Sequence, residues 1–166
     1  MKTDERLADK QVGQASKMEA EPNAMKTALT ISQRVALCVP AGVLGALAVV
    51  LSKYLLFELG LSAALGVNVP VSLKSPDIYR PLFWGGLWGI PFGLLVRVAW
   101  RKLYLFGLLY VLAPLLVSFL IFLPMSGAGY FGLRQGPMFT VYLLLVNVPF
   151  GIVTALAARA IIGKTP

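Results

Sequence analysis

The stretch that decides the fold is VALCVPAGVLGALAVVLSKYLLF, which occupies residues 35–57 and contains one charged residue, Lys53. A helix needs about 20 consecutive apolar residues to cross the ~30 Å hydrocarbon core of a bilayer. Three further apolar runs are comparable, Pro81–Ala99, Leu103–Leu123 and Met138–Ile162. Because none of them alternates as a barrel strand does, the sequence predicts an all-α polytopic membrane protein with four transmembrane helices.

The composition excludes most catalytic and metal chemistry. Of the 166 residues, 58% are apolar and 13% are charged, whereas soluble domains carry about 25% charged residues. There is no histidine, and Cys38 is the one cysteine. An intrachain disulfide, a histidine-activated nucleophile and the usual zinc and haem ligand sets are therefore excluded. We expect a protein that is not an enzyme and that binds no cofactor and no metal.

The basic residues predict the orientation in the membrane. Beyond residue 25 there are eleven basic and two acidic residues, mostly at the ends of the apolar runs. This distribution indicates contact with the lipid bilayer and not with nucleic acid. Seven basic residues fall on one side and four on the other, and the richer side is expected to be cytoplasmic, with both termini. The seven are Lys26, Arg34, Arg97, Arg101, Lys102, Arg159 and Lys164, and the four are Lys53, Lys74, Arg80 and Arg134.

The polar N-terminal segment and the loops complete the expected organisation. Residues 1–33 have mixed charge and are expected to be a disordered cytoplasmic tail, which leaves 34–166 as the four-helix transmembrane domain. Met1-Lys2-Thr3 recurs as Met25-Lys26-Thr27, so translation could also start at Met25. In the long first outer loop, Leu61–Val67 is predicted to form a short interfacial helix. Trp100–Lys102 forms the tight inner turn.

Two similar motifs raise the question of an internal repeat. GIPFG at residues 89–93 and NVPFG at 147–151 are each followed, ten residues after the proline, by an arginine, at Arg101 and Arg159. A true repeat would make the chain two tandem helical hairpins related by an axis along the membrane normal. Chance is an equal alternative, because proline, phenylalanine and glycine are common in membrane helices.

The second apolar run carries a stripe of small residues beside a stripe of aromatic ones. Gly85, Gly89 and Gly93 recur at every fourth position, and Trp84 and Trp88 lie next to them. Small residues at this spacing allow another helix to approach closely. The stripe is predicted to pack within this chain's own bundle, or alternatively to form a face for a second membrane protein.

A second group of candidate residues lies near the middle of the predicted spans. Pro91 and Pro149 each remove a backbone hydrogen bond, so they predict kinks or, alternatively, freed carbonyls that line a solute pathway. Asn147 is expected to hydrogen-bond across helices or to a carbonyl freed by Pro149, with a solute-lining amide as the alternative. Lys53 and Arg97 lie shallow enough to extend to the headgroups, so we expect them to flank their helices.

The run from Ser52-Lys53 to Pro70-Val71-Ser72-Leu73-Lys74-Ser75-Pro76-Asp77 resembles the YagU-type small four-helix proteins of the bacterial inner membrane. That resemblance implies a bacterial inner-membrane location and carries over no functional residue. From the residues themselves, we expect a non-enzymatic accessory, assembly or scaffolding subunit of a larger membrane complex. The alternative is a small channel or transporter for an anionic or neutral solute.

Overall fold

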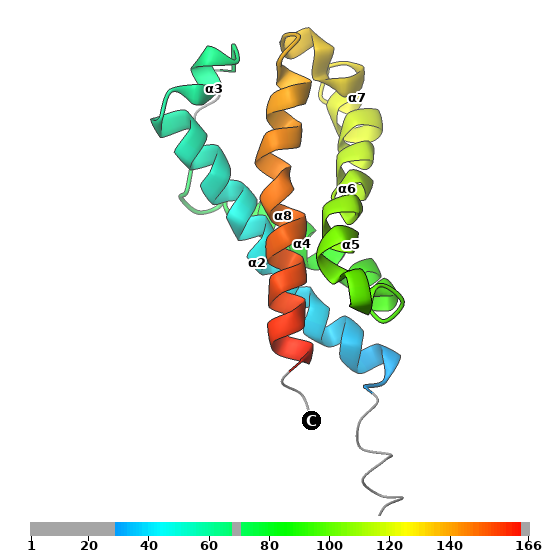
Figure 1. Ribbon diagram of the computed structural model, residues 1–166. Helices are drawn as coiled ribbons and strands as arrows, with labels where there is room; N and C mark the ends of the chain where they lie inside the picture. Colours follow the sequence, from blue (N-terminus) through cyan, green and yellow to red (C-terminus); the bar gives the residue numbers. More distant parts are fainter. Residues whose placement is uncertain (1–28, 68–70, 164–166) are drawn as a thin grey trace, which may run out of the picture. The chain divides into compact units, whose positions relative to one another are not determined.

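The computed structural model describes residues 29–67 and 71–163 (Figure 1). This part of the chain is helical and contains no strand, and its helices belong to one compact unit that begins at Ile31. Residues 1–28, most of the predicted tail, lie outside the described residues. The elements are α2 (Ile31–Glu58), α3 (Leu61–Ala64), α4 (Tyr79–Leu95), η1 (Trp100–Lys102), α5 (Leu103–Tyr110), α6 (Leu112–Val117), η2 (Ser118–Phe122), α7 (Leu123–Met125), η3 (Tyr130–Gln135) and α8 (Phe139–Ile162).

Within the described residues, three helical stretches are long and apolar enough to cross a membrane. They are α2, the run Trp100–Met125 that joins η1 to α7, and α8. This result is consistent with a membrane protein, with three candidate spans where the sequence predicts four. The predicted span Pro81–Ala99 corresponds to α4, which has 17 residues. At 1.5 Å per residue it extends over about 25 Å, less than the ~30 Å hydrocarbon core.

Glycine brings α4 against α2. A Cβ placed on Gly89 would lie 2.9 Å from Cα of Val39, and one on Gly93 would lie 2.8 Å from Cα of Val35. Such distances mean that the two backbones touch, so a side chain has no room between them. The glycine stripe is therefore used inside the chain, and α2 covers it.

Glycine also allows close backbone approach at two further helix contacts. Gly107 on α5 and Gly151 on α8 each lie against the other's backbone, and a Cβ on Gly151 would lie 2.6 Å from the carbonyl carbon of Gly107. Where α2 crosses α8 (Figure 1), Gly45 lies against Thr154 and Phe150. Close approach lets dispersion contacts accumulate, which holds helices together in lipid, where there is no hydrophobic driving force between them.

The contact between α4 and the α5–η2 segment is of a different kind, because aromatic rings form it. The rings of Trp84 and Phe122 are 5.1 Å apart, and those of Phe92 and Tyr110 are 5.1 Å apart. The Tyr110 hydroxyl also donates a hydrogen bond of 2.6 Å to the Trp88 carbonyl. Edge-to-face ring pairs hold their helices at side-chain distance. The backbones of α4 and the α5–η2 segment are therefore farther apart than those at the three helix contacts made through glycine.

The third apolar run is helical but irregular. Pro114 in α6 cannot donate to the Tyr110 carbonyl, and the helix then widens into the single π-turn η2. The Ser118 hydroxyl at the start of η2 donates to the Pro114 carbonyl at 2.9 Å. These features form one wall of the cavity described below.

The two Pro-Phe-Gly motifs occupy similar environments. Phe92 and Phe150 are both buried, and Gly93 and Gly151 each lie against the long helix that precedes them in the chain.

The predicted interfacial helix Leu61–Val67 is present in part, because α3 covers its first four residues. Val67 is buried and belongs to a small apolar cluster with Tyr142 and Val146 of α8.

Candidate functional site

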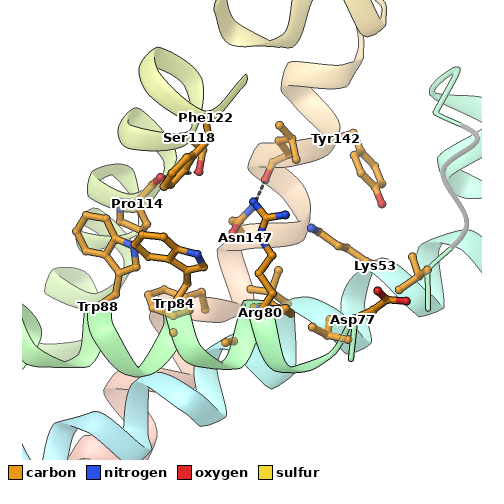
Figure 2. A pocket seen from close by; sticks show the side chains of 18 of the residues that line it. Lys53, Asp77, Arg80, Trp84, Trp88, Pro114, Ser118, Phe122, Tyr142 and Asn147 are labelled. Atoms are coloured by element: carbon orange, nitrogen blue, oxygen red, sulfur yellow. Dashed lines mark hydrogen bonds between the residues drawn. The ribbon is translucent and has the colours of Figure 1, made fainter. Parts of the chain in front are cut away.

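A cavity of about 570 Å³ lies between α2, α4, the α6–η2 segment and α8 (Figure 2). Its volume is within the usual range for small-molecule sites, about 300–1,000 Å³. It occupies the half of the bundle that carries α3 and the segment 71–78. Its apolar lining includes Ala46, Val49, Val50, Val71, Pro81, Gly85, Pro114, Phe122, Phe139, Leu143 and Phe150, and its polar lining includes Lys53, Ser72, Asp77, Arg80, Trp84, Trp88, Ser118, Tyr142 and Asn147.

Two cationic side chains enter this cavity from different helices. Lys53 comes from the C-terminal part of α2, where it is half-buried, and Arg80 comes from the first turn of α4. Figure 2 shows both pointing toward Asn147 on α8. Asp77 also lines the cavity, but within the described residues neither cation forms an ion pair with a carboxylate. Two cations and one carboxylate leave the lining with a net charge of +1.

The uncharged polar groups add mainly hydrogen-bond donors. The indole N–H groups of Trp84 and Trp88 donate only, and neither finds an acceptor in the part of the chain that the structure describes. The amide of Asn147 donates to the Leu143 carbonyl at 2.8 Å and so keeps one N–H and its oxygen for the cavity. With Lys53 and Arg80, the site offers more donors than acceptors. Such a site is suited to a ligand that is rich in acceptors.

The residues predicted from the sequence are divided between packing and cavity. Gly89 and Gly93 lie in the contact with α2, and Gly85 lies in that contact and also lines the cavity. Trp84 and Trp88, from the predicted aromatic stripe, form part of the cavity wall (Figure 2). The glycines of the stripe are therefore covered by α2, and the rings of Trp84 and Trp88 contact Phe122 of η2 and Tyr110 of α5.

The central polar and proline residues need two corrections. Asn147 lines the cavity, but its hydrogen bond goes to Leu143 in its own helix, neither across helices nor to the Leu145 carbonyl that Pro149 frees. Side-chain bonding to the fourth preceding carbonyl is the nearest choice on a helix. Pro91 and Pro149 do not line the cavity, and Pro91 borders a separate hollow on α4.

The sequence analysis assigned Lys53 and Arg80 to helix flanks and did not single them out as site residues, although the transport alternative took the basic residues of the outer side to favour an anionic or neutral solute. One signal was available: Lys53 is the single charge in a run of 23 residues, 35–57. An ionisable residue inside a predicted span is by default a functional candidate. Arg80 carried no comparable signal, since it stands in a polar loop next to a span.

The arrangement can bind and orient a ligand. Within the described ranges, 29–67 and 71–163, no group of three or more cysteines and carboxylates is placed to hold a metal ion. Asp77 is exposed at the cavity edge. Comparisons with models of protein families, with curated proteins and with solved structures gave no match for this chain.

Proposed function

We propose that this protein binds an anionic solute in the cavity and acts as a small transporter. The observation that carries the proposal is the convergence of Lys53, Arg80 and Asn147, from three helices, on one space with no ion pair among the described residues. Lys53 is half-buried among apolar residues without a counter-ion among the described residues, which is energetically costly, and a bound anion would lower that cost. Arg80 is exposed and adds its positive charge to the lining. The excess of hydrogen-bond donors in the lining also favours a negatively charged ligand.

The proposed setting is the bacterial inner membrane, with four spans and cytoplasmic termini. Support for α4 as the fourth span is its antiparallel course along the first half of α2, since Gly85 lies against Gly42 and Gly93 lies against Val35. Its 17 residues are the lower limit of the range found for membrane helices, about 17–25. The excess of basic residues at η1 and at both chain ends supports the orientation.

Labelling of single cysteines tests this topology. In a Cys38→Ala background, Lys74→Cys, Arg101→Cys and Gln135→Cys are exposed to a membrane-impermeant maleimide in intact cells and in inverted vesicles. Four spans require residues 74 and 135 to react on one side and residue 101 on the other. If residue 101 reacts on the same side as residue 74, α4 does not cross the membrane.

Tryptophan fluorescence tests the anion site. The chain has three tryptophans, and Trp100→Phe leaves the two that line the cavity. In nanodiscs, iodide, as the anionic probe, should quench Trp84 and Trp88 more strongly than caesium does. Lys53→Gln or Arg80→Gln should lower the iodide quenching constant at least twofold, because each removes a cation from the lining. Quenching by neutral acrylamide should not change.

The matched control is Lys74→Gln, which removes the same charge from the same side of the bundle without touching the cavity. It should leave iodide quenching within experimental error of the parent protein. If all three variants reduce iodide quenching equally, the effect is one of overall surface charge, and the proposed site is wrong. Flux of radiolabelled anions into proteoliposomes then separates binding from transport.

The accessory-subunit hypothesis becomes the second candidate. Its main structural argument was the glycine stripe as a partner face, and α2 covers those glycines. Native mass spectrometry of the protein, extracted at its natural level in mild detergent, tests it directly. Stoichiometric co-purification of other membrane subunits would restore that function, and a monomer or homo-oligomer would leave transport as the working hypothesis.

A further inference from the structure

A second hollow adjoins the cavity on the outer side of α4. It measures about 250 Å³ and is lined by Trp84, Leu87, Trp88, Ile90 and Pro91. Trp84 and Trp88 line both spaces, so the two indoles stand between the charged cavity and the second hollow. Leu87 and Ile90 are 42% and 38% exposed. In a membrane protein such apolar residues face lipid, so this hollow opens to the bilayer.

The indoles lie at a helix contact made by side chains and not by backbone. Backbone contact through glycine closes α2 against α4, α2 against α8, and α5 against α8. Between α4 and the α5–η2 segment, the contact is made by side chains: the Trp84–Phe122 and Trp88–Tyr110 ring pairs and the hydrogen bond from the Tyr110 hydroxyl to the Trp88 carbonyl. Rotation of the Trp84 ring opens the contact with Phe122 without moving a helix. The opposite wall, with Pro114 and the π-turn η2, is also the most irregular stretch of helix around the cavity.

From this geometry we propose that the bound anion is amphipathic and has a single apolar chain. Its anionic head lies at Lys53 and Arg80, and its chain passes between Trp84 and Trp88 into the hollow along Leu87–Pro91. The inference rests on the proposed anion site and adds to it the ligand class and a lateral path to the bilayer. Tryptophan suits this position, because its ring packs against a chain while its N–H can donate to a head group.

The test uses the same Trp100→Phe protein in phosphatidylcholine nanodiscs, with a mid-chain brominated dodecanoate as the probe. Bromine on a chain lying between the indoles quenches them by contact. Brominated dodecanoate should quench at concentrations at least tenfold lower than brominated dodecanol, which has the same chain and no charge. Arg80→Gln should abolish most of this difference. A further set of nanodiscs containing brominated-chain lysophosphatidylglycerol, which has one chain, distinguishes a membrane lipid from a free acid as the source.

Filling the hollow tests the position of the apolar chain independently of the position of the anionic head. Ile90→Phe narrows the hollow from the lipid side, and Leu94→Phe adds the same volume one turn further along, at an exposed position outside it. Ile90→Phe should weaken quenching by brominated dodecanoate at least fivefold and leave iodide quenching unchanged. Leu94→Phe should alter neither measurement.

The outcomes distinguish the two proposals. If iodide quenching depends on Lys53 and Arg80 but dodecanoate and dodecanol quench alike, the anion site stands and the amphipathic ligand is wrong. Equal dodecanoate quenching in the Ile90→Phe and Leu94→Phe proteins would likewise overturn the lateral path. If no anion distinguishes the Lys53→Gln and Arg80→Gln variants from Lys74→Gln, the proposed function fails first.

Discussion

Gly89→Ala is predicted to destabilise the bundle although it adds one methyl group. The new Cβ would meet the Cys38 carbonyl oxygen and lie 2.9 Å from Cα of Val39 and 3.0 Å from the Cys38 carbonyl carbon. All three are backbone atoms, so no rotamer change relieves the overlap. Ordinary contact begins near 3.4 Å, and the Cys38 carbonyl oxygen is the closest of the three atoms. The α2 helix must therefore retreat by roughly 1 Å, which forfeits up to about half of the dispersion well of each contact.

The expected loss follows from two opposing terms. Overpacking costs about 1–3 kcal/mol, and replacing a helical glycine by alanine returns about 0.5–1 kcal/mol. We therefore expect a net destabilisation of about 1–2 kcal/mol. Because the glycine contact also sets the position of α4, tryptophan quenching by iodide should change in the same variant.

The assay is reversible unfolding in mixed micelles of mild detergent and dodecyl sulfate, followed by circular dichroism. Gly86→Ala is the matched control on the same helix, because its Cβ would meet only the side-chain ends of Val43 and Val39, at 3.2 and 3.6 Å. It should be as stable as the parent protein or more stable by up to about 1 kcal/mol, because alanine favours the helix and meets only movable side-chain ends. Equal stability of the two variants would refute the backbone contact between α2 and α4.

Two further substitutions test individual polar groups by the same unfolding assay. Thr154→Val should leave stability unchanged or raise it by up to about 1 kcal/mol, because the buried Thr154 hydroxyl has no hydrogen-bond partner among the described residues. A loss of more than about 1 kcal/mol of stability would show that the hydroxyl is hydrogen-bonded. Tyr110→Phe should cost about 0.6 kcal/mol, the typical value of a side-chain hydrogen bond in a membrane protein, because it removes the bond to the Trp88 carbonyl; no loss together with unchanged Trp88 emission would contradict that bond.

The positions of the helices could be predicted from the apolar runs alone. The predicted span 35–57 lies within α2, and the predicted span Met138–Ile162 differs from α8 by one residue at its start. This agreement has a physical cause, because lipid leaves an apolar run little alternative to helix. The prediction fails for the end of α4, which stops at Leu95, four residues before Ala99. Val96–Ala99 form a turn that contains the charged Arg97 among three apolar residues. Hydropathy does not distinguish such a turn from the end of an apolar helix.

The cavity could not be predicted for a related reason. In a soluble helix the apolar stripe identifies the buried face. Here the long helices are apolar on all sides, so periodicity does not show that Lys53 faces inward while Leu51 and Leu55 face outward. Which side of α2 faces inward depends on which glycines contact which neighbouring helix. The sequence shows where the small residues are but not which helix each one contacts. Asn147 was identified because it is polar, and its place in the cavity was one of the alternatives kept open.

The positions of the glycine contacts relate the two Pro-Phe-Gly motifs to the cavity. The first hairpin, α2 and α4, and the second, formed by Trp100–Met125 and α8, each contain a glycine contact that includes the glycine of the Pro-Phe-Gly motif. The cavity takes its walls from both hairpins, with Lys53 and Arg80 from the first and Ser118 and Asn147 from the second. Transporters built from tandem halves bind their solute between the halves. If the two motifs mark such halves, the ligand site should lie between the hairpins, and the charged cavity lies there.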